Sequence, residues 1–167
     1  YEAITYEGYA PGGVALLIDV LTDNRNRTGA EVRNVFSKLG GSMAEPGAVG
    51  WQFSRKGVIM VSGGSEDDVM MAALDAGAED ISADEDGWRV LCDSSSVYEV
   101  RDALQAAGLT VANAESTMVA SVNVEVTDPD DARKILRIMD ALEDNDDVQD
   151  VYSNFDISEE LMERVGG

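Results

Sequence analysis

The chain has 167 residues, enough for one or two ordinary domains, and carries a formal net charge of −21. With 44% hydrophobic residues it can build buried cores, which excludes a wholly disordered tail. The lack of histidine excludes a histidine general base, and the single cysteine, Cys92, excludes a disulfide framework. No apolar run approaches the roughly 20 residues that span a bilayer, and the first residues lack a signal-peptide pattern. We therefore expect a cytoplasmic protein without membrane contact.

The negative charge is unevenly distributed along the chain. Residues 1–55 have a net charge of −1, whereas residues 56–118 and residues 119–167 each have −10. Acidic surfaces repel a phosphate backbone, so only the first third of the chain is expected to face an anion. The acids elsewhere are interpreted as solvated faces that keep the protein soluble.

The first third of the chain predicts two strands and a helix. Apolar patterning indicates strands over residues 1–7 and 13–22, separated by a glycine-rich turn. A helix is expected over about residues 28–39, with Thr28 starting a capping box. Residues 49–55 then predict a further strand. The buried face of the helix is predicted from four apolar residues at helical spacing: Val32, Val35, Phe36 and Leu39.

The middle of the chain contains an internal repeat at an offset of 30 residues, in which residues 58–61 align with residues 88–91. Each half predicts a strand, a helix and a strand, with the helices starting at Ser65 and Ser96. The Asp-Gly pair that ends at Gly87 predicts the hairpin turn between the halves. Two such halves in tandem are typical of a ferredoxin-like fold.

The last third predicts a strand over residues 119–126, a helix over residues 129–143 and a strand over residues 147–153. Asp128 is the expected N-cap of this helix, with proline in its first turn. The apolar face of the helix is predicted from five residues: Ala132, Ile135, Leu136, Met139 and Leu142.

The order of these elements predicts an α+β protein with two α/β-sandwich domains. One strand–helix–strand unit cannot bury its own faces, so the last third is expected to pair with the strands of residues 1–55. The first domain is then discontinuous, with residues 1–55 plus 119–167. The second is inserted into it as a ferredoxin-like (βαββαβ) domain of residues 56–118.

Residues 22–28 have the most unusual local composition. Two arginines and two asparagines beside a helix start can bind phosphate oxygens, with help from free helix N–H groups. Alternatively, the arginines pair with acids and the asparagines make turns, and the sequence leaves both interpretations open. Four of the twelve bases lie between residues 25 and 38. The candidate contacts to nucleic acid or a ribosome are Asn24, Arg25, Asn26, Arg27, Thr28, Arg33 and Lys38.

A glycine-rich loop is the second candidate region. Glycine lets a backbone approach a partner closely, although a simple hairpin turn is the alternative. The spacing of its glycines matches neither dinucleotide- nor triphosphate-binding motifs. The candidate close-approach residues are Gly8, Tyr9, Pro11, Gly12 and Gly13.

No metal site, cofactor, small-molecule substrate or enzymatic activity is expected. The acids that follow Leu142 begin like a calcium loop, but Gln149 and Phe155 occupy the positions of its required glycine and glutamate. No pattern in the sequence places two particular carboxylates together in a cleft for general acid–base catalysis. The remaining conspicuous large side chains are expected in the cores: Trp51, Phe53, Met70, Met71 and Trp88.

An ordered series of segments, rather than one motif, identifies a similarity to a known family. These segments are Tyr6–Gly13, Asp23–Thr28, Glu31–Arg33, Phe36–Gly41, Phe53–Gly57, Ala76–Asp80 and Leu142–Gln149. Through them the chain resembles the YebC/PmpR family across nearly its whole length.

The resemblance implies a regulator of gene expression, usually described as a probable DNA-binding transcriptional regulator of the bacterial cytoplasm. It also implies an alternative, a ribosome-associated translation factor that binds ribosomal RNA, because a mitochondrial relative is a translational activator. The family fold has a basic helical domain followed by two α+β domains. This chain resembles only the latter two, so contact with nucleic acid is expected mainly through the full-length protein.

Overall fold

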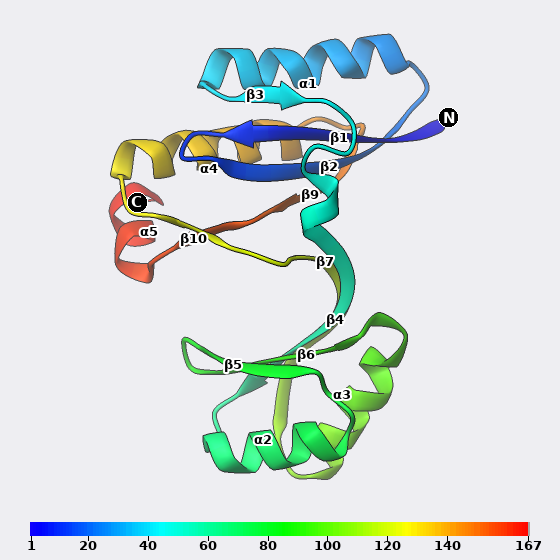
Figure 1. Ribbon diagram of the computed structural model, residues 1–167, viewed down its shortest axis with the longest axis vertical. Coiled ribbons are helices and arrows are strands. Elements are labelled where there is room, and N and C mark those ends of the chain that lie inside the picture. Colours follow the sequence, from blue (N-terminus) through cyan, green and yellow to red (C-terminus); the bar gives the residue numbers. More distant parts are fainter. Residues whose placement is uncertain (167) are drawn as a thin grey trace. The chain divides into compact units, whose positions relative to one another are not determined.

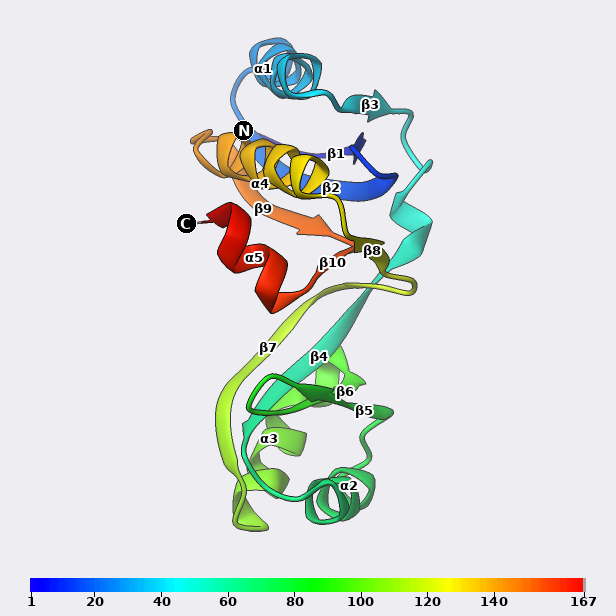
Figure 2. The ribbon, with the colours of Figure 1, turned by 90° about the vertical axis from the view of Figure 1, so that its left-hand side faces the viewer.

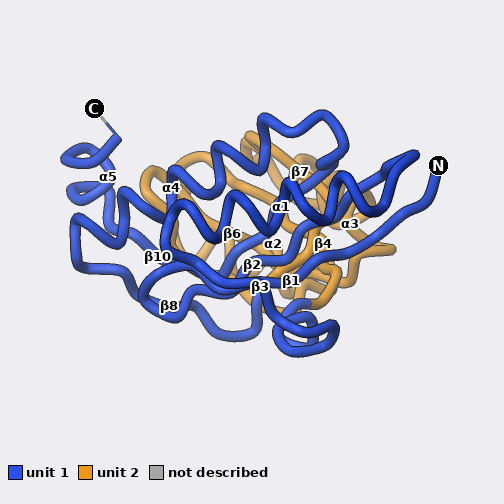
Figure 3. Tube along the Cα trace, turned by 90° about the horizontal axis from the view of Figure 1, so that it is seen from above, with its two compact units in different colours: residues 1–53, 120–167 blue, residues 54–119 orange. Residues whose placement is uncertain are grey.

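The computed structural model describes residues 1–166 and divides the chain into two compact units, coloured separately in Figure 3. Unit 1 combines Tyr1–Phe53 with Ala120–Gly167, and unit 2 is Ser54–Val119. Both units combine helices with mainly antiparallel strands, which confirms the predicted α+β class.

Unit 1 contains a four-stranded sheet in the order β3-β1-β2-β9 (Figure 1). It also contains a parallel pair of short strands, β8 and β10 (Figure 2). Its elements are β1 (Glu2–Ala10), β2 (Val14–Thr22), α1 (Arg25–Leu39), β3 (Ser42–Ala44), the 3-10 helix η1 (Gly50–Gln52), β8 (Val124–Val126), α4 (Pro129–Glu143), β9 (Val148–Ser153), β10 (Phe155–Ile157) and α5 (Glu159–Gly166). The pairing of β2 with β9 joins the two separated stretches of sequence into one sheet.

The core of unit 1 lies between one face of the four-stranded sheet and helices α1 and α4. Alternate β2 residues from Val14 to Val20 are buried there against Phe36 of α1 and Ile135 of α4. Burial of each such side chain stabilises the fold by about 1.5–3 kcal/mol. Phe36 packs directly on Gly8, where a Cβ atom would lie 2.6 Å from the ring.

Three details of unit 1 differ from expectation. The predicted strand over residues 49–55 is right only for its last three residues, because residues 50–52 form η1 and the strand β4 (Phe53–Ser62) begins at Phe53. In α4, Ile138 is fully buried, whereas the predicted Leu136 is only half-buried. The strands β3 and β10 were not predicted, because three residues are too few to show a period of two.

Unit 2 has the strand order β5-β6-β4-β7 within a βαββαβ sequence, which is the predicted ferredoxin-like arrangement. Its elements are β4 (Phe53–Ser62), α2 (Glu66–Asp75), β5 (Asp80–Asp84), β6 (Gly87–Asp93), the 3-10 helix η2 (Ser94–Ser96), α3 (Val97–Ala106) and β7 (Thr110–Ala120). Figure 2 shows α2 and α3 beside the strands of this unit. Their buried residues, including Val69 and Leu104, form one cluster with Ile59 and Val90 of the sheet.

The helix and turn signals of unit 2 are partly as predicted. Ser65 caps α2 through its hydroxyl, which accepts from Asp68 N. Ser96 makes no side-chain cap, because η2 precedes α3. Gly87 starts β6 with a negative φ, so it is not the left-handed turn residue. A Cβ atom on Gly87 would lie 1.8 Å from the carbonyl oxygen of Val61, so glycine is needed for close strand approach.

Three of the large side chains expected in the cores are exposed instead. Trp51 is 76% exposed on η1, and Met71 and Met70 are 66% and 36% exposed on α2. The methionines point outward because α2 buries its opposite face, which carries Val69 and Ala73. The expected burial of Phe53 is confirmed.

Candidate nucleic-acid interface

The N-terminus of α1 begins earlier than the sequence pattern indicated. Asn24 is the N-cap, and its side-chain oxygen accepts from Arg27 N at 3.1 Å. The predicted capping box at Thr28 is therefore wrong, because Thr28 already lies within the helix. Its hydroxyl is fully buried and lies 2.7 Å from Asp147 Oδ2 and 2.8 Å from Thr22 Oγ1. Thr28 cannot reach an external partner and instead fastens α1 to the turn before β9.

Arg27 is held inside the protein's own acidic network. Its guanidinium lies 2.8 Å from Asp147, 3.1 Å from Asp23 and 3.9 Å from Glu31. Hydrogen bonds from Thr28 and then Arg27 hold the pKa of Asp147 below its usual value, and the bond to Asp147 raises the pKa of Arg27. Three carboxylates therefore compensate this guanidinium, which favours the structural interpretation of Arg27.

Arg25 and Asn26 remain open to solvent beside this network. Arg25 lies 3.4 Å from Glu2, with 64% of its side chain exposed. Exposed pairs of this kind contribute about 0–1 kcal/mol, so an incoming phosphate can displace Glu2. Of the candidates at this end of α1, Arg25 and Asn26 are the two that neither cap the helix nor bind Asp147.

The glycine-rich loop separates into a buried part and an exposed turn. Gly8 and Tyr9 belong to β1, and Gly8 serves internal packing under Phe36. Gly12 and Gly13 form the exposed turn, with φ values of 85° and 79° that favour glycine. Gly8 is therefore buried, and the exposed part of this loop is the tip of the β1–β2 hairpin.

The hairpin tip lies beside the C-terminal end of α1. At Gly40, which follows the helix, an added Cβ atom would lie 3.9 Å from Pro11 Cγ and 3.8 Å from Lys134 Cδ. The exposed Lys38 occupies the last turn of α1 at this end. Lys134 of α4 was not singled out from the sequence, because only folding brings it to the hairpin.

The two predicted regions lie at opposite ends of α1 and do not form one compact site. Lys38 follows Arg25 by 13 residues of this helix, which at 1.5 Å per residue separates the two by about 20 Å. The exposed face of α1 connects them. That face includes the exposed polar residues Asn34 and Ser37, which no sequence pattern marked as candidates.

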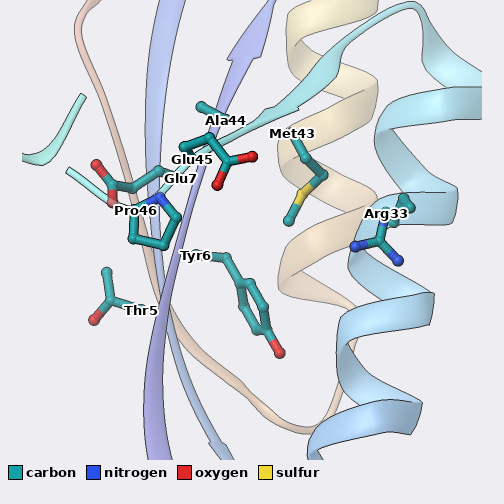
Figure 4. Close-up of a pocket in the computed structure, with 8 residues that line it drawn as sticks. All are labelled: Thr5, Tyr6, Glu7, Arg33, Met43, Ala44, Glu45 and Pro46. Carbon is teal, nitrogen blue, oxygen red and sulfur yellow. The ribbon is translucent and has the colours of Figure 1, made fainter. Parts of the chain in front are cut away.

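Arg33 lines a separate cleft of about 380 Å³ beside β1 and β3, drawn in Figure 4. The ring of Tyr6 and the side chain of Met43 lie on the Arg33 side of β1, and Glu7 lies on the other side. Arg33 forms no ion pair within residues 1–166, so its guanidinium is available to an anion.

Glu7 is a buried carboxylate that the sequence did not identify. It is 7% exposed and accepts N–H groups from Gly47, Val49 and Gly50. Burial raises the pKa of Glu7, but the three backbone hydrogen bonds outweigh it and leave the pKa below its usual value. An acid satisfied by three backbone donors is a structural anchor for the segment before η1.

Two further properties concern the residues that the structure describes. Between residues 1 and 166 no group of three acid or cysteine side chains is placed to hold a metal ion. No helix in the same range is long and apolar enough to cross a membrane.

Comparisons with known proteins all point to one family. A family model described as the second and third domain of TACO1/YebC matches residues 1–155. A protein of Salinispora arenicola, named "Probable transcriptional regulatory protein", is 52% identical over 99% of this chain and 67% of its own length. One of the same name from Rubrobacter xylanophilus is 51% identical, again over 67% of its length. This chain thus spans about two thirds of those relatives.

A crystal structure gives the same result for the fold. A conserved hypothetical protein of Aquifex aeolicus superposes with a TM-score of 0.75 and 41% identity. The match covers 95% of this chain and 66% of that one. On sequence and on structure, the chain belongs to the TACO1/YebC family.

Proposed function

We propose that the protein regulates gene expression without catalysing a reaction and contacts nucleic acid through the outer face of α1. The observation that carries this proposal is the charge of α1. The helix holds four bases and one acid, a net charge of +3, in a chain whose net charge is −21. The names of the relatives support the regulatory role.

The outer face of α1 carries side chains suited to nucleic acid. Arginine and lysine bind phosphate oxygens, and asparagine also pairs with base edges. Lys38 and Arg33 are free of ion pairs within residues 1–166, and Arg25 is only weakly paired. The exposed contacts we propose are Arg25, Asn26, Arg33, Asn34, Ser37 and Lys38.

DNA is the first candidate target, since the relatives are named for transcription. A second candidate is ribosomal RNA, and the acids around α1 favour it. A helix in a DNA major groove has phosphates on both sides, whereas Asp23, Asp144 and Asp146 would repel phosphates near its N-terminal end. RNA that contacts α1 from its exposed side alone avoids that repulsion.

A binding titration with the full-length protein tests the proposal. Fluorescence anisotropy would follow a labelled 30-base-pair DNA duplex and a labelled ribosomal RNA fragment at several salt concentrations. The double variant Arg33→Ala/Lys38→Ala should bind more weakly and reduce the salt slope by about 0.9 per lost contact on duplex DNA. Arg101→Ala is the matched control, because Arg101 already pairs with Asp102 in unit 2. An unchanged affinity and slope in the double variant would contradict the proposal.

A further inference from the structure

An exposed apolar surface lies on α2 of unit 2. Met70, Met71 and Leu74 are 36%, 66% and 64% exposed. Since α2 buries Val69 and Ala73 against the sheet, the three large side chains share the outward face of the helix. We call these three residues the α2 patch. Three large apolar side chains together on the otherwise acidic outward face of a helix mark an interaction surface rather than a scattered exposure.

Carboxylates surround the α2 patch. Glu66, Asp67 and Asp68 lie in the first turn of α2, Asp75 ends the helix, and α2 contains no base. Residues three or four positions apart are neighbours on a helix surface. Met70 therefore has acids one turn toward the N-terminus, and Met71 has acids one turn away in both directions. A partner that covers the patch therefore also meets negative charge.

The rest of unit 2 does not offset this charge. Residues 54–119 contain thirteen acids and four bases, a net charge of −9. Three of the four bases are already used within the unit. Lys56 pairs with Glu79, Arg101 pairs with Asp102, and Arg55 donates to a backbone carbonyl.

We infer that the α2 patch is a docking surface for a basic amphipathic helix of a partner protein. The apolar side of such a helix would cover the methionines and Leu74, and its lysines and arginines would meet the surrounding acids. Methionine side chains are flexible and adapt to differently shaped apolar partners. A second copy of this chain is disfavoured, because two faces with net charge −9 would repel each other, and a phosphate backbone is repelled for the same reason.

A peptide of about 18 residues, with leucines on one helical face and lysines on the other, is a suitable probe. Its binding to the whole chain would be followed by fluorescence anisotropy. We expect saturable binding that is weakened roughly tenfold or more by Met71→Gln/Leu74→Gln. These side chains are exposed, so their replacement leaves the core of unit 2 intact. Val122→Gln is the matched control, because Val122 is also 66% exposed but lies in unit 1, and it should change the affinity less than about twofold.

Two further measurements separate this surface from simple charge attraction. Glu66→Gln/Asp75→Asn should weaken binding at low salt and flatten its salt dependence. A scrambled peptide of the same composition should bind far more weakly than the amphipathic one. Equal binding of the scrambled peptide, or an unchanged affinity in Met71→Gln/Leu74→Gln, would overturn the inference. Self-association of the chain that this double variant abolishes would also overturn it, since the occupant would then be a second copy.

Discussion

Replacing Glu7 with glutamine should loosen the segment before η1. One carboxylate oxygen of Glu7 accepts from Val49 N and Gly50 N, and the other accepts from Gly47 N. Glutamine keeps one of these oxygens but places an NH₂ donor where the other stood. With the shared oxygen retained for Val49 and Gly50, the part-buried N–H of Gly47 then faces a donor, and the remaining bonds lose their charge assistance. Hydrogen bonds to charged groups contribute about 1.5–3 kcal/mol, so we expect a loss of about 3 kcal/mol in the free energy of unfolding of unit 1.

The same contacts determine how the free energy of unfolding of unit 1 depends on pH near the pKa of Glu7. The pKa of Glu7 in the folded protein lies below its ordinary value of 4.5. In the interval between the two values the unfolded chain binds more protons, so stability rises with pH. The contribution of Glu7 is therefore fully present above about pH 4.5 and is lost as the pH falls through the folded pKa. Glu7→Gln should remove this part of the acid dependence.

Urea unfolding and amide hydrogen exchange together measure the effect. The amides of Val49 and Gly50 should exchange faster in Glu7→Gln, because their acceptor is weakened. Glu45→Gln is the matched control, since Glu45 lies in the same segment and is exposed. Its carboxylate accepts no hydrogen bond from any residue between 1 and 166. The same unfolding free energy and exchange rates in both variants would refute this account of Glu7.

Two further substitutions test the contacts that shape each unit. Thr28→Val preserves the shape of a buried residue but removes the hydroxyl bound to Asp147, so unit 1 should lose about 1–2 kcal/mol of unfolding free energy. An NMR titration should also show a higher pKa for Asp147 in that variant, and an unchanged pKa would contradict the assigned hydrogen bond. Gly87→Ala should destabilise unit 2 by several times the effect of the exposed control Ser82→Ala, because its Cβ atom meets the backbone of Val61. Equal thermal unfolding midpoints for these two variants would show that the strands can separate at Gly87 with no loss of unfolding free energy.

The ferredoxin-like unit could be predicted because its signals are local and repeated. Two halves at an offset of 30 residues carry the same alternation of strand and helix, and Ser65 gives a helix start that the structure confirms. The start of α1 could not be decided locally. Asn24 and Thr28 are both acceptable N-caps, and Asp147, distant in sequence, selects the first by binding Thr28.

The candidate interface was predictable in its charge but not in its availability. The clustering of bases between residues 25 and 38 anticipated the positive charge of α1. Which bases remain free depends on carboxylates from other elements, and Arg27 is compensated by Asp147 of a turn far along the chain. The burial of Glu7 was invisible for the same reason, because its donors come from residues 47–50 and no local pattern marks them.

The most direct test of the proposed function is ultraviolet cross-linking of the full-length protein in cells, followed by identification of the peptides that carry a nucleotide. The account predicts cross-links in peptides from Arg25–Leu39, and their loss in Arg33→Ala/Lys38→Ala. The nucleic acid recovered with those peptides would distinguish promoter DNA from ribosomal RNA. Cross-links that map only outside α1, or that persist unchanged in the double variant, would contradict the assignment of α1 as the nucleic-acid contact.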